Sequence, residues 1–125
     1  MWDVNVVRIY TGADNRSYFE ELRLPMGEIV QGDRVSQRSE LIPTANMLFR
    51  ENPLGRSEAY HTPKQRQFVI TISGAVEITC AGGSRVFGPG DVLFAAARVE
   101  HRFEGFSDDF ATWVVFYGPP GGEAA

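Results

Sequence analysis

The chain of 125 residues has the length of one compact domain, and 43% hydrophobic residues suffice for a core. Its formal net charge of −4 argues against nucleic acid as the main partner, because phosphate binding requires a basic surface. The sequence contains no run of about 18 apolar residues, so no transmembrane helix is expected, and the first residues show no signal-peptide pattern. Cys80 is the single cysteine, so no internal disulfide is expected and the sequence predicts a cytoplasmic protein.

Short strand patterns separated by turn residues follow one another along the chain. In chain order, strands are predicted over residues 4–10, 17–24, 46–50, 67–73, 76–80, 84–87, 92–95, 100–103 and 111–117. The polar stretch 27–44 is expected to be irregular with a turn at Gly32, whereas 67–73 and 76–80 are expected to form a hairpin across Gly74. This many short strands predicts a sandwich or barrel, and the tail 119–125 is expected to be disordered.

The strand predicted at 67–73 has two different faces, because alternate residues of a strand share one side. One side is mixed polar and the other is apolar. The first carries Gln67, Val69, Thr71 and Ser73, and the second carries Phe68, Ile70 and Ile72. The mixed side suits the lining of a cavity. The apolar side must be covered, and we predict a homodimer, with coverage by the chain's own N-terminal strands as the alternative.

Two histidines each lie in a glycine-framed pattern. The patterns are Gly55, His61, Pro63, Gln67 and Gly74, and then Gly90, Ala96, Arg98, His101 and Gly105. Their spacing resembles the two motifs of the cupin superfamily. The resemblance implies an all-β fold, a small jelly-roll β-barrel of two packed antiparallel sheets. The barrel would occupy residues 46–117 of a single cupin domain at 1–118.

Several ligand positions of that family differ in this chain. By the resemblance, His61 corresponds to the first histidine and His101 to the last, but Pro63 occupies the place of the second histidine and Gln67 that of the glutamate. Two imidazoles and one amide oxygen hold a divalent transition metal less well than the full set. The resemblance implies either an Fe, Mn, Ni, Co or Zn site at His61, Gln67 and His101, or a barrel that has lost its metal.

The same three residues suit catalysis without a metal. A neutral histidine accepts a proton near pH 7, and its conjugate acid returns it. His61 and His101 would divide these roles, while Gln67 would hydrogen-bond a carbonyl or enolate oxygen. We therefore predict an enzyme acting on a small organic molecule, by metal-assisted dioxygenase, isomerase or lyase chemistry, as the resemblance implies, or by histidine acid–base chemistry. The alternative is a non-catalytic small-molecule binding or sensor domain.

Further side chains are candidates for the wall of the pocket. The predicted lining comprises Met47, Phe49, Val69, Thr71 and Trp113. Such a lining favours an apolar or aromatic ligand. Arg50 and Arg66 would bind a carboxylate if they reach the pocket, although alternation from Gln67 directs Arg66 outward. Cys80 is expected to be a small apolar filler rather than a nucleophile.

Overall fold

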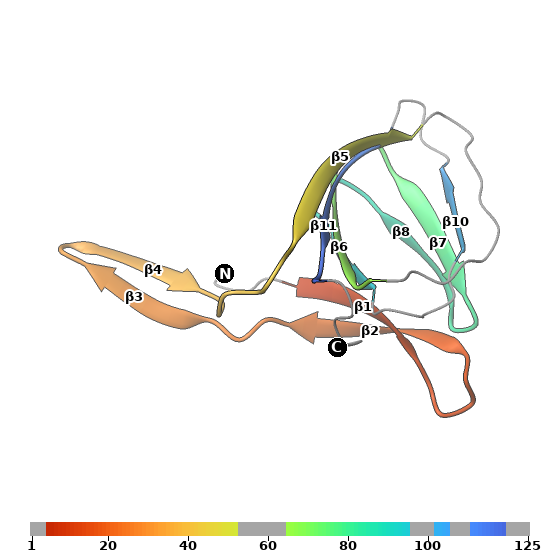
Figure 1. The fold of residues 1–125 in the computed structure, drawn as a ribbon, viewed down its shortest axis with the longest axis horizontal. Coiled ribbons are helices and arrows are strands. Elements are labelled where there is room, and N and C mark those ends of the chain that lie inside the picture. Colours follow the sequence, from red (N-terminus) through yellow and green to blue (C-terminus); the bar gives the residue numbers. More distant parts are fainter. Residues whose placement is uncertain (1–4, 53–64, 96–101, 106–110, 120–125) are drawn as a thin grey trace.

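The computed structural model describes residues 5–52, 65–95, 102–105 and 111–119, and within these ranges its regular elements are all β-strands (Figure 1). The strands are β1 (Asn5–Thr11), β2 (Ser17–Arg23), β3 (Gly27–Gln31), β4 (Arg34–Arg38), β5 (Asn46–Asn52), β6 (Gln67–Ser73), β7 (Val76–Cys80), β8 (Gly83–Phe87), β9 (Val92–Ala95), β10 (Arg102–Gly105) and β11 (Ala111–Tyr117). The predicted disordered tail lies outside the described residues from position 120 onward. None of the described residues belongs to a helix that is long and apolar enough to cross a membrane.

Two packed sheets form the body of the molecule. The larger sheet has six strands in the order β2-β1-β9-β6-β11-β5, and the smaller has three in the order β10-β7-β8. Their pairings are antiparallel except for β1 and β9, which run parallel. The all-β fold of packed sheets predicted from the sequence is therefore confirmed. The sheets are not antiparallel throughout, because β1 and β9 form a parallel pair.

The core lies between the inner faces of these two sheets. Strands β7 and β11 alternate between buried and half-buried residues, which is the pattern of strands with one face in a core. The buried apolar cluster comprises Ile9, Val69, Leu93, Ala95, Ala111, Trp113 and Val115 from the large sheet and Val76, Ile78, Cys80 and Phe87 from the small one. Ile9 is fully buried, which contributes about 1.5–3 kcal/mol for a side chain of this size.

The connection between β6 and β7 differs from the sequence-based expectation. The bounds of both strands agree with the prediction, but β6 pairs with β9 and β11, whereas β7 pairs with β8 and β10. The turn at Gly74, whose φ is 72°, therefore carries the chain from one sheet to the other. The predicted hairpin is wrong because β6 and β7 do not pair with each other. They pack face to face across the core, with Val69 on one side and Ile78 on the other.

Residues 27–38, called the arm below, project from the barrel as a separate two-stranded hairpin (Figure 1). The predicted turn at Gly32 is present, with a φ of 65°, but the expectation of an irregular stretch is wrong. Every residue of β3 is exposed. A strand exposed on both faces has no need to alternate apolar and polar residues, so the usual strand signal is missing.

The side of the large sheet that faces away from the small sheet is called the outer face. Its register-matched apolar residues are Met47, Phe49, Phe68, Ile70, Val92, Phe94, Val114 and Phe116. A groove of about 260 Å³ lies on this face, lined by Val6, Leu24, Ile42, Thr44, Phe68, Ile70, Val92 and Phe116. The N-terminal segment therefore covers part of the apolar side of β6, while Ile72 stays 48% exposed.

Candidate functional site

Gln67 is the described residue on which the predicted site centres. It is the first residue of β6, and its strand partners are Ala95 of β9 and Tyr117 of β11. Gln67 is half-buried and shares the inner face of β6 with Val69 and Thr71, both of which are buried. Its polar amide therefore stands at one end of an inner face that also carries the buried Val69 and Thr71.

The structure brings together the attachment points of both histidine-bearing segments. His61 and His101 themselves lie outside the described residues. The segment with His61 leads into β6, six positions before Gln67, and the segment with His101 leaves β9, six positions after Ala95. Because Gln67 and Ala95 are direct strand partners, the two segments join the sheet at the same end.

Three of the five predicted lining residues lie together inside the barrel. Thr71 and Trp113 are strand partners, with exposures of 2% and 4%, and Val69 is also buried. The backbone of Thr71 is fixed by the turn before β9: its N–H donates to the Asp91 oxygen at 3.2 Å, and its oxygen accepts from the Gly90 N–H at 2.8 Å. These residues form a buried, mostly apolar wall.

The other two predicted lining residues, Met47 and Phe49, lie on the outer face. Their strand partners are Phe116 and Val114, whereas Arg50 pairs with the inward-facing Trp113. Met47 is 48% exposed and Phe49 is 70% exposed. Their placement beside Trp113 is therefore corrected, because alternation along β5 puts residues 47 and 49 on the side opposite to residue 50.

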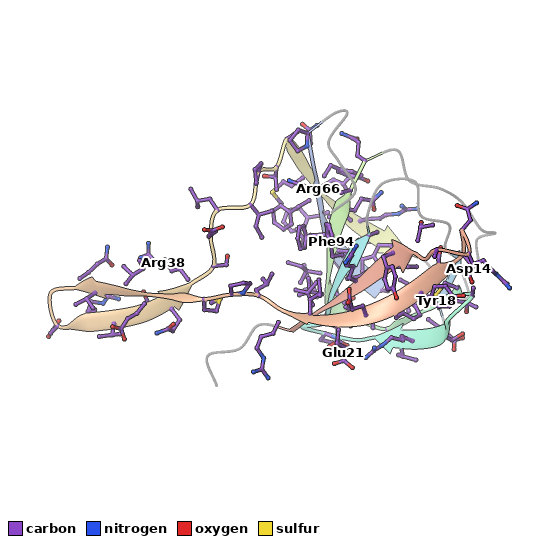
Figure 2. The ribbon with its side chains drawn as sticks, turned by 90° about the horizontal axis from the view of Figure 1, so that it is seen from below. Asp14, Tyr18, Glu21, Arg38, Arg66 and Phe94 are labelled. Carbon is purple, nitrogen blue, oxygen red and sulfur yellow. The ribbon has the colours of Figure 1, made fainter. Side chains whose placement is uncertain are left out.

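The two arginines considered for carboxylate binding have different surroundings. The Arg50 guanidinium carbon lies 6.0 Å from the centroid of the Trp113 ring, which puts its charge on the inner side of β5. The Arg66 guanidinium donates a hydrogen bond to the Pro43 carbonyl oxygen on the outside of the barrel. Figure 2 shows Arg66 at the margin of the barrel, away from the arm residue Arg38. Arg50 therefore remains a candidate for an anionic ligand group, and Arg66 has a structural contact.

Tyr117 is a candidate that the sequence analysis did not single out. It is the strand partner of Gln67, and it packs against the core cluster from the same side as Trp113 and Val115. Its phenol therefore belongs to the end of the barrel where Gln67 lies. The signal was present in the sequence, because residues 113, 115 and 117 alternate along one strand.

Cys80 lies in the core, as expected for a small apolar filler. Burial raises the pKa of its thiol, while the N–H groups of Gly82 and Gly83 oppose that shift. A thiol with a raised pKa holds little thiolate at neutral pH, and thiolate is the nucleophilic form. The environment of Cys80 therefore does not favour a nucleophilic role.

The donors around Gln67 fit a complete metal site poorly. Within the described ranges, no group of three or more His, Cys, Asp or Glu side chains could hold a metal ion. The strand neighbour Ala95 offers no ligand atom, and the Gln67 amide oxygen is a neutral donor. By the motif, His61 and His101 would complete the set, and a divalent cation would meet no carboxylate at the glutamate position, which Gln67 occupies.

Comparisons with known proteins bear on this architecture. A family model for the cupin domain matches residues 47–117, more than half of the chain. The chain is similar to KdgF from a Halomonas species, with 20% identity and a TM-score of 0.53 over 65% of this chain and 74% of that one. It is also similar to a cupin protein from Bacteroides fragilis, with 21% identity and a TM-score of 0.52 over 67% and 73% of the two chains.

A third similar structure is the cupin domain of Cnp3 from Schizosaccharomyces pombe, with 8% identity and a TM-score of 0.56 over 94% of this chain and 88% of that one. At such identities the likeness shows the fold alone. A comparison with curated proteins gave no match. The two glycine-framed motifs, the packed sheets and the family match over residues 47–117 together show that this chain belongs to the cupin superfamily.

Proposed function

We propose that the barrel binds a small organic molecule at the Gln67 end and catalyses a proton transfer on it. His61 and His101 serve as the acid and the base, and Gln67 holds an oxygen of the substrate. The observation that supports this most directly is the pairing of Gln67 with Ala95, at the end of the sheet to which both histidine-bearing segments connect.

The division of roles follows from the chemistry of the side chains. Imidazole exchanges protons near neutral pH, so one histidine removes a proton from carbon while the other protonates the oxygen or a second carbon. The Gln67 amide N–H donates to the oxygen on which negative charge develops. Arg102 is the strand partner of Thr79, whose neighbours Ile78 and Cys80 are buried. The proposal requires His101, the residue before Arg102, to lie on the same inward side as Ile78 and Cys80.

The surroundings of Gln67 indicate the substrate class. Val69, Thr71 and Trp113 offer an apolar wall with one hydroxyl, and Tyr117 adds a phenol at the same end as Gln67. A small carbonyl compound with an apolar body suits such a site, because its oxygen meets the polar end and its carbon skeleton meets the wall.

Proton exchange in heavy water tests this proposal without knowledge of the physiological substrate. The probe is a set of small keto acids and diketones, and the measurement is deuterium incorporation beside the carbonyl by NMR. Exchange should fall by about 10²–10⁴-fold in His61→Ala and in His101→Ala. Gln67→Leu should reduce it by up to about 10²–10³-fold.

The matched control is Gln65→Leu, which removes the same amide two positions away. The Gln65 Nε2 donates to the Gly118 oxygen at 3.0 Å, so its loss should lower stability by about 0.5–1.5 kcal/mol and leave exchange in place. Binding of the probes without any exchange would support the non-catalytic binding domain instead. Stoichiometric metal lost with the histidines, measured by elemental mass spectrometry on the same samples, would replace acid–base catalysis with a metal-assisted reaction.

A further inference from the structure

The inner side of β5 is more exposed than that of β11 beside it. β5 is the last strand of the large sheet, and its residues Leu48 and Arg50 pair with Val115 and Trp113 of β11. The two β11 residues are 2% and 4% exposed, whereas Leu48 is 38% exposed and Arg50 is half-buried. Strand partners project to the same side of a sheet, so the inner side of β5 is accessible to a small molecule.

The accessible side chains follow one another in a fixed chemical order. Asn46 pairs with Tyr117, and Tyr117 pairs with Gln67, so two amides and a phenol lie in one row across the sheet. Leu48 follows two positions further along β5, and Arg50 two positions after that. The inner side of β5 is therefore polar and uncharged at the Gln67 end, apolar in the middle and cationic at the far end.

Arg50 supplies the charge that an anionic group needs. Its guanidinium carbon lies 6.0 Å from the centroid of the Trp113 ring, on the inner side of the sheet. The adjacent carboxylate of Glu51 belongs to the other side of β5 by alternation. A chain with a net charge of −4 repels small anions in general, so a local cation is needed to bind one. A guanidinium binds a carboxylate with two parallel hydrogen bonds, which makes an organic acid the fitting ligand.

A second inward-facing arginine, Arg85, has a different role. It is the strand partner of the buried Ile78, and its Nη2 lies 3.5 Å from Oε2 of Glu21. Glu21 belongs to β2, which lies at the end of the large sheet opposite to β5. The ion pair of Arg85 therefore links the two sheets on the side away from Arg50. Arg85 provides a control that removes the same charge at a distant place.

The register of the strands sets the length of a molecule that touches both polar ends. Gln67 and Arg50 lie in rows four residues apart, because Arg50 pairs with Trp113 and Gln67 with Tyr117. At about 3.3 Å per residue, the two rows are about 13 Å apart along the strands. The two side chains bridge part of this distance. A ligand that reaches both must carry its carbonyl and its carboxylate at opposite ends.

We propose that the substrate is an elongated oxo acid whose carboxylate is bound by Arg50, and that Arg50 determines this specificity. The carbonyl oxygen meets Gln67, and the carbon chain between the two groups lies along Leu48. The placement of the carbonyl rests on the proposed function, whereas the binding of the carboxylate by Arg50 does not require a reaction.

Calorimetric titration with a charged and a neutral form of one probe tests the anion site. The probes are 6-oxoheptanoate and its methyl ester, which share a carbon skeleton and the ketone. Wild type should bind the acid about tenfold or more tightly than the ester, because a hydrogen bond to a charged group contributes about 1.5–3 kcal/mol. Arg50→Gln should remove this preference and leave the affinity for the ester unchanged, whereas Arg85→Gln should keep it.

The outcomes for the ester separate a lost contact from a damaged fold. An Arg50→Gln protein that binds the ester as wild type does has an intact site. Wild type that binds acid and ester equally, or binds neither at millimolar concentration, would refute the proposal. A preference for the acid that survives Arg50→Gln would refute it as well.

Deuterium exchange with the same probes distinguishes failure of the site from failure of the reaction. Wild type should exchange 6-oxoheptanoate faster than its isomer 2-oxoheptanoate, in which the carboxylate adjoins the ketone. Equal rates for the two isomers would overturn the elongated substrate and leave the proposed reaction standing. Binding of the acid that depends on Arg50, with no exchange of any probe, would support the anion site and overturn the proposed reaction alone.

Discussion

Trp113 and Phe49 are large aromatic residues on neighbouring strands of one sheet, yet their surroundings are opposite. Trp113 on β11 is 4% exposed and belongs to the core, whereas Phe49 on β5 is 70% exposed on the outer face. Around Trp113, the inner face is packed by side chains of its own chain from both sheets. The outer face and the arm leave large apolar groups in contact with water. In this protein, the chain itself buries the inner face around Trp113, whereas large apolar side chains of the outer face remain exposed.

The strongest test of this difference is truncation of a core residue. Trp113→Ala should lower the free energy of unfolding by about 3–5 kcal/mol, because it leaves a cavity between the sheets. Val86→Ala, on the outer side of the small sheet, is the control, since Val86 is 54% exposed and its loss should be within about 1 kcal/mol. Urea-induced unfolding measures both. Equal losses would show that the core does not depend on Trp113.

Thiol modification compares how accessible the core and the arm are to a reagent in solution. Burial raises the pKa of Cys80, so its thiol should react with a thiol reagent much more slowly in the folded protein than in the unfolded chain. In a Gln31→Cys variant, the introduced thiol on the exposed polar face of the arm should react at once while Cys80 does not. Mass spectrometry of the modified peptides distinguishes the two. Equal rates would mean that the barrel opens readily.

A matched pair of glycine substitutions compares the barrel with the arm. Gly90, with a φ of 88°, and Gly32, with a φ of 65°, both adopt backbone conformations that disfavour a side chain, and an added Cβ has open space at both. Gly90→Ala should lower the free energy of global unfolding by about 1–2 kcal/mol. Gly32→Ala should strain only the arm and leave the global transition of the barrel nearly unchanged. A large global loss from Gly32→Ala would make the arm part of the barrel's cooperative unit.

The smallest effect is expected in the exposed turn between β1 and β2. The Tyr18 hydroxyl donates to the Asp14 carboxylate, which lowers the pKa of Asp14 from 3.8 and raises the pKa of Tyr18 from 10.0. The Asp14 contribution to stability is present above pH 3.8 and is lost as the pH falls through its folded-state pKa. The Tyr18 contribution is present below pH 10.0 and is lost as the pH rises through its folded-state pKa.

Thermal unfolding across pH tests this contact. Tyr18→Phe removes both contributions, so wild type should be slightly more stable than the variant near neutral pH and should lose that advantage at both extremes. Tyr10→Phe is the control, because it removes a phenol hydroxyl from the strand partner of Tyr18 and leaves the contact with Asp14 intact. A difference between wild type and Tyr18→Phe that is constant with pH would contradict the hydrogen bond.

Strands with a buried face were predicted with accurate bounds, whereas the exposed strands of the arm were not predicted. The predicted bounds of β6, β9 and β11 match the structure, because these central strands have buried residues and clear turns at their ends. The arm was missed because exposure on both faces removes the alternation on which strand prediction depends. In the candidate site, alternation correctly grouped Gln67, Val69 and Thr71, but it left open which face of β5 turns inward. The positions of His61 and His101 stay predictions.

By itself, the sequence determined the local quantities: the strand periods, the turn at Gly32, the glycine-framed motifs and hence the cupin family. These depend on residues within a few positions of one another. Only the tertiary structure decided that β6 and β7 join different sheets, that Phe49 faces outward and that Gln67 meets Ala95 and Tyr117. Such pairings depend on which distant strands share hydrogen bonds and buried area, and a period of two is the same whichever face a strand buries.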